Sequence, residues 1–167
     1  MSRLFLLRHA KAGWAAPGVR DFDRALDASG WTDAEATGAA MREQGMVPDL
    51  VLCSSARRAR ETLEAVNRVL PDLPVNYLDG LYATDAAGYL EHVQAAMPVA
   101  SLLVVGHNPM MEDLGFALSA EGEAAACDAL ASGFPTSGLA VIRFDGPLSD
   151  AAPGKGYLEA FLVPAAH

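Results

Sequence analysis

The sequence is short of cysteine, of basic residues and of long apolar runs, and each shortage argues against a class of protein. Its two cysteines, Cys53 and Cys127, are far apart and lack metal-ligand spacing, so neither a disulfide-stabilised scaffold nor a cysteine-ligated metal is expected. Twelve basic residues against 21 acidic ones give a net charge of −9, which disfavours nucleic acid or an anionic membrane as the main partner. No apolar stretch could span a bilayer, and the first run ends at Arg8, too early for a signal peptide. We therefore expect a cytoplasmic protein.

What the sequence does contain is enough for a substantial hydrophobic core. Hydrophobic residues make up 51% of the 167 residues, which is typical of a globular chain rather than a disordered or fibrous one. A chain of this length without an internal repeat or linker is expected to form a single domain over residues 1–167. Because basic residues are few, the positions where they gather indicate where an anion would bind.

A buried strand is predicted over residues 4–7, and it ends abruptly in Arg8 and His9. Open α/β sheets place their chemistry at the carboxyl ends of their strands. An unpaired guanidinium is costly to bury, so Arg8 is poor core material. The pair suits an anion clamp beside a neutral, nucleophilic nitrogen.

A second buried strand is predicted over residues 50–53, and a helix should follow with Ser54 and Ser55 at its N-cap. Three arginines crowd into the first turns of this helix, against the positive end of its dipole. Local conflicts of this kind tend to fall at functional sites, and an anion bound at the helix start would resolve this one. The alternative is a solvated basic helix start. The three arginines are Arg57, Arg58 and Arg60.

A third buried strand is predicted over residues 102–105, which are uniformly aliphatic. It is bounded by Gly106, and His107 follows directly. Asn108 is expected to cap a helix whose first residue is Pro109. An isolated histidine is often structural, but one at the end of a buried strand, like His9, is better placed for function.

The remaining elements are predicted from periodicity and turn residues. Thr32 and Glu35 form a capping box, which predicts a helix from residue 32 to about residue 44. Asp85 is expected to cap a later helix. We also expect a loop over 11–28, strands over 75–78, 139–144 and 157–163, a helix and turn over 119–135, and a frayed tail over 165–167.

Three of these segments together resemble the histidine phosphatase superfamily, and in particular its small phosphohistidine phosphatase (SixA-like) branch. They are the Arg8-His9 pair, residues 54–62 and residues 106–109. The resemblance implies a three-layer α/β/α sandwich with a mainly parallel central sheet, the phosphoglycerate mutase-like fold. It implies that His9 accepts the phosphoryl group and that Arg8, Arg58 and His107 surround it. Arg58, rather than Arg57 or Arg60, matches the phosphate-binding arginine of the family.

Two further segments depart from the pattern of the family. Residues 21–26 resemble an Asp-x-x-Arg-Pro-Leu segment whose arginine faces the phosphate pocket, which implies a phosphate-binding role for Arg24, although Ala25 replaces the proline. The alternative is a solvated loop. Larger relatives keep a carboxylate general acid at a position that corresponds here to Ala83. The nearby carboxylates are those of Asp79 and Asp85.

The function that this resemblance implies is a metal-free phosphatase that acts through a phosphohistidine intermediate on His9. Its substrate would be protein phosphohistidine or a small phosphomonoester. No aspartate-rich metal cluster or glycine-rich nucleotide loop is present in the sequence, so neither a metal nor a cofactor is expected. Two alternatives remain: a noncatalytic phospho-ligand binding module, and a phosphomutase, which is less favoured because the chain lacks a clear acid.

Overall fold

Within residues 1–164, which the computed structural model describes, seven strands form one sheet at the centre of the fold. They are β1 (Ser2–Arg8), β2 (Leu50–Ser54), β3 (Val75–Leu78), β4 (Ser101–Gly106), β5 (Ser119–Gly122), β6 (Leu139–Phe144) and β7 (Gly156–Leu162). Their order across the sheet is β3-β2-β4-β1-β6-β7-β5. Neighbouring strands are antiparallel at β1/β6 and β6/β7 and parallel at the other junctions. The sheet is therefore mainly parallel, as the sequence predicts.

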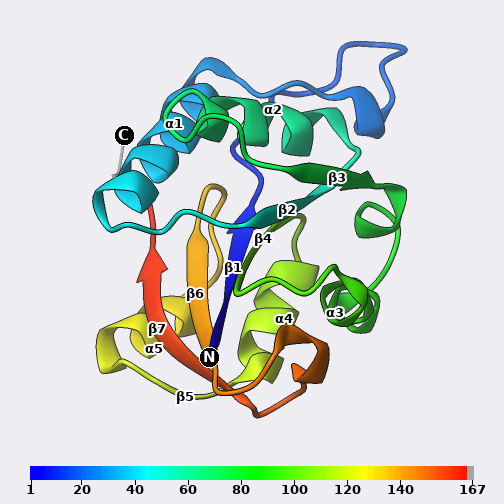
Figure 1. Ribbon diagram of the computed structural model, residues 1–167. Coiled ribbons are helices and arrows are strands. Elements are labelled where there is room, and N and C mark those ends of the chain that lie inside the picture. The colour runs from blue at the N-terminus through cyan, green and yellow to red at the C-terminus, as the bar shows by residue number, and fades with distance from the viewer. Residues whose placement is uncertain (165–167) are drawn as a thin grey trace.

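Helices cover both faces of the sheet (Figure 1). They are α1 (Ala28–Glu43), α2 (Arg57–Asn67), α3 (Ala86–Ala95), α4 (Met110–Leu118) and α5 (Ala124–Ala131), with 3-10 turns η1 (Asp21–Asp23), η2 (Asp79–Leu81) and η3 (Leu148–Asp150). Helices α1 and α2 pack on one face, and α3, α4 and α5 pack on the other. This confirms the three-layer α/β/α sandwich.

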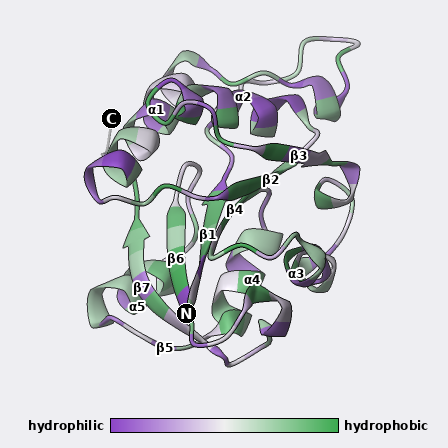
Figure 2. Cartoon of the chain, in the orientation of Figure 1, coloured by the Kyte–Doolittle hydropathy of each residue, from purple (hydrophilic) through white to green (hydrophobic). Residues whose placement is uncertain are grey.

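The side chains of β1 alternate between the two faces and so supply both halves of the core. Phe5 and Leu7 join the cluster under α1 and α2, whereas Leu4 and Leu6 join the cluster under α3, α4 and α5. All four are at most 1% exposed, and each buried side chain of this size contributes about 1.5–3 kcal/mol to the free energy of unfolding. Hydrophobic colouring concentrates in the strands accordingly (Figure 2). The same alternation directs Arg8, two residues beyond Leu6, towards the α4 and α5 layer.

The first helix begins four residues earlier than the capping box predicts. Its N-cap is Asp27, whose Oδ1 accepts a hydrogen bond from the Gly30 N–H at 2.7 Å. Thr32 instead donates its hydroxyl to the Ala28 carbonyl. Gly30 lies in the first turn because the Lys11 carbonyl approaches so closely that a Cβ would lie 2.2 Å from its oxygen. This tertiary contact explains why a glycine, rather than a residue with a side chain, occupies the first turn.

Residues 119–135 also differ from the predicted helix and turn. A short edge strand, β5, comes first and pairs in parallel with β7, and α5 begins only at Ala124. A Cβ on Gly122 would lie 2.7 Å from the Leu158 Cβ, so a glycine permits this close pairing. Polar edge strands lack the apolar alternation that marks half-buried ones, which is why the sequence pattern missed β5.

The strands predicted over 75–78 and 139–144 are confirmed as β3 and β6, and the last strand is confirmed one residue earlier at each end. Both cysteines are free, and Cys53 is buried in the core. Of the helices in residues 1–164, none has the length and apolar character needed to cross a membrane. The tail predicted over 165–167 lies outside the described residues.

Candidate active site

Three adjacent strands, β2, β4 and β1, bring the predicted site residues to one edge of the sheet. The register pairs Arg8 with Gly106, and the His9 N–H donates to the Gly106 carbonyl at 2.9 Å. His9 and His107 therefore follow directly from neighbouring strands, and their ring centroids lie 5.1 Å apart. All of these groups lie at the carboxyl ends of parallel strands, where open α/β sheets bind ligands.

The His9 ring is held in one tautomer. Its Nδ1 lies 2.7 Å from the Ala10 carbonyl oxygen, which can only accept, so Nδ1 carries the proton. Nε2 is then unprotonated, and its lone pair accepts a hydrogen bond from the Arg58 Nε–H at 3.3 Å. Burial lowers the pKa of His9 to about 3, and the nearby charges of His107, Arg58 and Arg8 act in the same direction. At neutral pH the ring is uncharged, with a nucleophilic nitrogen directed at a cation.

Arg58 is the arginine of the helix start that enters the site. It is 8% exposed, whereas the side chain of Arg57 is half-exposed and pairs with Glu61, and Arg60 donates to the Ser55 carbonyl. The helix itself starts later than the two serines predict: Ala56 occupies the N-cap without a side-chain hydrogen bond. Of the three arginines that crowd the start of this helix, Arg57 and Arg60 thus lie at the surface, and Arg58 faces His9.

Arg8 lies on the other side of His9, in the layer of α4 and α5. Its Nη1 donates to the Phe134 carbonyl at 2.8 Å, and its Nε is buried without a hydrogen-bond partner among residues 1–164. Burial lowers the pKa of Arg8, and the Glu112 carboxylate opposes that shift. The charges of both guanidinium groups therefore act on the imidazole of His9, and Arg8 keeps a buried donor that no group within residues 1–164 accepts.

His107 completes the group of buried polar side chains. Its Nε2 lies 2.8 Å from Ser54 Oγ, and its Nδ1 is buried without a partner in the described part of the chain. Burial lowers the pKa of His107 to about 4, with help from the charges of Arg58 and Arg8. An anion placed between these cations would raise that pKa again and favour the imidazolium form. Ser54, which the sequence reading treated as a helix cap, is thus a neighbour of His107.

The helix after His107 also begins one residue late. Pro109 occupies the N-cap position, and α4 starts at Met110. Asn108 contributes as expected, since its Oδ1 accepts the Glu112 N–H at 3.1 Å.

Two residues of the site have no role in the sequence reading: Asp21 and Tyr82. The Asp21 carboxylate accepts hydrogen bonds from Arg24 at 3.0 Å, from Arg58 at 3.1 Å and from the Tyr82 hydroxyl at 2.8 Å. The hydrogen bond from Tyr82, helped by Arg24 and Arg58, lowers the pKa of Asp21 to about 2. The Tyr82 ring lies edge-on to His107, with centroids 5.5 Å apart.

Asp21 had a sequence signal of a kind, because an Asp-x-x-Arg spacing brings the two side chains together on one turn. Arg24 reaches the other candidates through that carboxylate, and its Nε donates to the Gly13 carbonyl. The carboxylates considered as acids lie elsewhere: Asp85 caps α3 through the Gly88 N–H, as predicted, and Asp79 begins η2. Tyr82 had no sequence signal, because it reaches His107 only through the fold.

No group of three or more histidine, cysteine, aspartate or glutamate side chains within residues 1–164 is placed to hold a metal ion. The polar groups that do converge are two guanidiniums, two imidazoles and the hydroxyls of Ser54 and Tyr82. Such a set suits a tetrahedral anion that carries two negative charges.

Comparisons with known proteins agree with this chemistry. A family model described as the histidine phosphatase superfamily (branch 1) matches residues 4–92. An uncharacterised protein of Mycobacterium tuberculosis is 36% identical over 161 residues, which are 95% of this chain and 99% of that protein. The crystal structure of a candidate phosphohistidine phosphatase SixA from Agrobacterium tumefaciens is 40% identical, covers 98% of both chains and has a TM-score of 0.85. A protein histidine phosphatase SixA complexed with tungstate is 25% identical, covers 97% of both chains and has a TM-score of 0.77.

Proposed function

The chain belongs to the histidine phosphatase superfamily, and from that premise we propose that it is a metal-free phosphatase whose phosphoryl acceptor is His9. That it is a phosphatase of this superfamily, with SixA-like neighbours, follows from the comparisons. The substrate and the steps below are our proposal. The substrate is protein phosphohistidine or a small phosphomonoester.

In the first step, His9 Nε2 attacks the phosphorus atom in line with the bond to the leaving group. The new P–N bond forms as the old bond breaks, and the leaving group keeps the electron pair. Arg58 and Arg8 carry the charge of the equatorial oxygens through charge-assisted hydrogen bonds. His107 becomes an additional donor once the phosphate has raised its pKa.

In the second step, water attacks the phosphohistidine and releases inorganic phosphate. His9 Nε2 receives the electron pair of the P–N bond and returns to its neutral form. The Ala10 carbonyl keeps the proton on Nδ1 throughout, so that Nε2 is again the free nitrogen. Positioning and electrostatics supply the catalysis, as is usual in phosphoryl transfer.

One observation carries this proposal: the Ala10 carbonyl holds the proton of His9 on Nδ1, so Nε2 is unprotonated and accepts a hydrogen bond from Arg58 Nε at 3.3 Å. A module that only bound phosphate would need the arginines, but it would not need a neutral imidazole with its lone pair aimed at the arginine that binds the phosphate. Burial of the ring also has a cost that a binding role does not explain.

The experiment is to trap the intermediate. The protein is mixed with radiolabelled phosphoimidazole, quenched in alkali after milliseconds and digested, and the label is mapped by peptide. We expect an acid-labile, base-stable label on residue 9 and a loss of turnover on the order of 10³-fold or more in His9→Ala. Phosphate binding without any label or turnover would support the binding module instead. Near-normal turnover by a folded His9→Ala protein would rule out the mechanism.

A further inference from the structure

The Asp21 carboxylate is a feature of the site that neither phosphate binding nor attack by His9 explains. It is an anion in contact with Arg58, a residue proposed to bind an anion, and its charge opposes the entry of phosphate. The side chain is 53% exposed and is fixed by donors from three different segments: Arg24, Arg58 and Tyr82. A carboxylate offers about four acceptor positions, so one position on Oδ1 stays open towards solvent.

The position of this carboxylate relative to His9 is set by Arg58. The Arg58 Nε faces His9 Nε2, whereas its Nη1 and Nη2 bind the carbonyl and the carboxylate of Asp21. His9 and Asp21 therefore contact different nitrogens of one guanidinium. Because attack is in line, the leaving group departs away from His9, and we place it on the side of Asp21, the carboxylate that this guanidinium brings into the site.

Tyr82 gives the same side an aromatic wall. Its ring lies edge-on to His107 on one side and to Phe22 on the other, with centroids 5.5 Å and 5.0 Å apart. Its hydroxyl donates to Asp21. A flat aromatic leaving group would therefore meet a ring and a carboxylate together.

We propose that Asp21, with Tyr82 beside it, determines specificity by pairing with the protonated ring of a phosphohistidine leaving group. This inference rests on the proposed function. An imidazole phosphorylated on one nitrogen keeps a basic second nitrogen, which can carry a proton. The Asp21 carboxylate accepts a hydrogen bond from that N–H, and the ion pair favours the protonated form of the substrate.

The position of the proton distinguishes this substrate from an ester. When the P–N bond breaks, its electron pair passes to the leaving nitrogen, and the positive ring becomes neutral imidazole with its proton still on the second nitrogen. No acid is needed. An alkyl ester instead leaves as an alkoxide, which needs a proton that an ionised carboxylate cannot give and whose charge Asp21 repels.

The test compares two substrates in matched variants. The ratio of kcat/KM for phosphoimidazole to kcat/KM for p-nitrophenyl phosphate is measured in the wild type, Asp21→Asn and Asp23→Asn. Asp23 is a suitable control because it lies on the same 3-10 turn and pairs with the surface Arg20. A lost contact to Arg58 affects both substrates and cancels in the ratio. We expect the ratio to fall about tenfold in Asp21→Asn, as befits one charge-assisted hydrogen bond, and to stay unchanged in Asp23→Asn.

An equal loss for both substrates in Asp21→Asn would overturn the inference and leave Asp21 as a residue that positions Arg58. The same ratio change in Asp23→Asn would overturn it too, because a general effect of charge would then explain both. Either result leaves the proposed function intact as long as the wild type forms a phosphoryl label on His9. Absence of that label, by contrast, removes the proposed function itself.

Discussion

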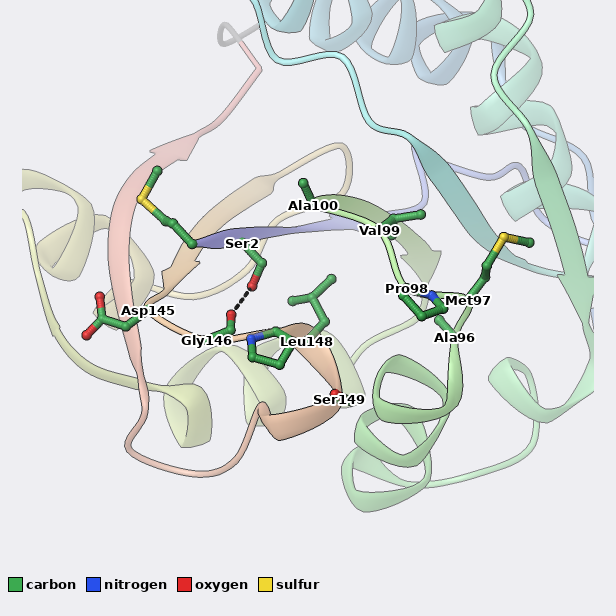
Figure 3. A pocket seen from close by; sticks show the side chains of 12 residues that line it. Ser2, Ala96, Met97, Pro98, Val99, Ala100, Asp145, Gly146, Leu148 and Ser149 are labelled. Atoms are coloured by element: carbon green, nitrogen blue, oxygen red, sulfur yellow. Dashed lines mark hydrogen bonds between the residues drawn. The ribbon is translucent and has the colours of Figure 1, made fainter.

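The two edges of the sheet differ in the polar side chains that they carry. At the carboxyl edge, the ends of β1, β2 and β4 are followed by buried polar side chains, among them His9, Arg58 and His107. At the amino edge, a cavity of about 400 Å³ lies between residues 96–100 and residues 145–149 (Figure 3). Asp145 is the only ionisable side chain among the described residues that line it. Of the other residues that line the cavity, Ser2 donates a hydrogen bond through its Oγ to the Gly146 carbonyl.

Open volume does not separate the two edges, because a larger cavity of about 630 Å³ opens at the carboxyl edge, where Arg8, Asn108 and Glu112 line it. The two edges differ instead in charge: the amino edge has few polar groups, whereas the carboxyl edge has two arginines, two imidazoles and a carboxylate that contacts Arg58. Function should therefore follow the charge rather than the open volume.

The largest effect should appear when kcat/KM is measured for a series of substrates that differ in their leaving group. The resemblance to the family predicts that Ala83 replaces the acid of larger relatives, and within residues 1–164 Asp85 caps α3 and Asp79 begins η2, with no hydrogen bond from either side chain to His9. Without a proton donor, esters with basic leaving groups should react about 10²-fold or more slowly than phosphohistidine and aryl phosphates. A flat series across leaving-group basicity would mean that an acid acts here after all, and Asp79 and Asp85 would be mutated first.

The second effect concerns anion binding at the same edge. Phosphate should raise the melting temperature of the wild type, because a ligand that binds the folded state stabilises it. Arg58→Ala should weaken phosphate binding at least tenfold, since it removes charge-assisted hydrogen bonds. Arg57→Ala is the matched control, one residue earlier and paired with Glu61 at the surface. Equal stabilisation of Arg58→Ala and wild type by phosphate would place the anion elsewhere.

A third effect is a dependence of stability on pH. The pKa of His107 is lowered by burial to about 4, from the usual 6.5. Between these values the unfolded chain holds a proton that the folded chain does not, so the free energy of unfolding falls as the pH drops from 6.5 towards 4. His9, with its pKa lowered to about 3, acts in the same direction.

Urea unfolding between pH 6.5 and pH 5 measures this slope. His107→Asn should make it shallower without abolishing it, since His9 still contributes. The full contribution of His107 is up to about 3 kcal/mol once the pH reaches 4. A variant with the wild-type slope would mean that the folded protein already carries a proton on His107.

The smallest effect on activity should come from the amino edge. Leu148 lines the cavity there and is 6% exposed. Leu148→Ala should lower the free energy of unfolding by about 2–4 kcal/mol through the enlarged cavity. Its kcat/KM, measured well below the melting temperature, should match the wild type. A large loss of activity in a folded Leu148→Ala protein would contradict the prediction that activity depends on the carboxyl edge alone.

The sequence was most informative where the local pattern and the global fold agree. Residues 4–7, 50–53 and 102–105 are uniformly apolar, so they could be recognised as central strands, and their ends told us where His9 and His107 would lie. The roles of these residues remain predictions, but the fold brings them together. The three-layer sandwich was implied by the resemblance to the histidine phosphatase superfamily, and the helices on both faces of the sheet confirm it.

What the sequence did not reveal depends on contacts between distant segments. Tyr82 contacts His107 and Asp21 only because η2 lies beside β2 and η1 lies beside α2. The early start of α1 depends on its N-cap Asp27, whose N–H donates to the Lys11 carbonyl at 3.0 Å. The edge strand β5 exists because β7 offers it a partner. None of these depends on a periodic pattern, so no reading of local propensity could find them.

Tyr89 connects the strand that ends at His107 to the segment that carries Tyr82. Its buried hydroxyl accepts the His107 N–H at 3.1 Å and donates to the Leu81 carbonyl, so one phenol joins the end of β4 to η2. A Cβ on Gly106 would lie 2.6 Å from that oxygen, so a glycine at this position leaves room for the phenol. The hydrogen bonds that Asp21 accepts from Arg24 and Tyr82 are exposed instead, so water competes with them but not with the contacts of Tyr89.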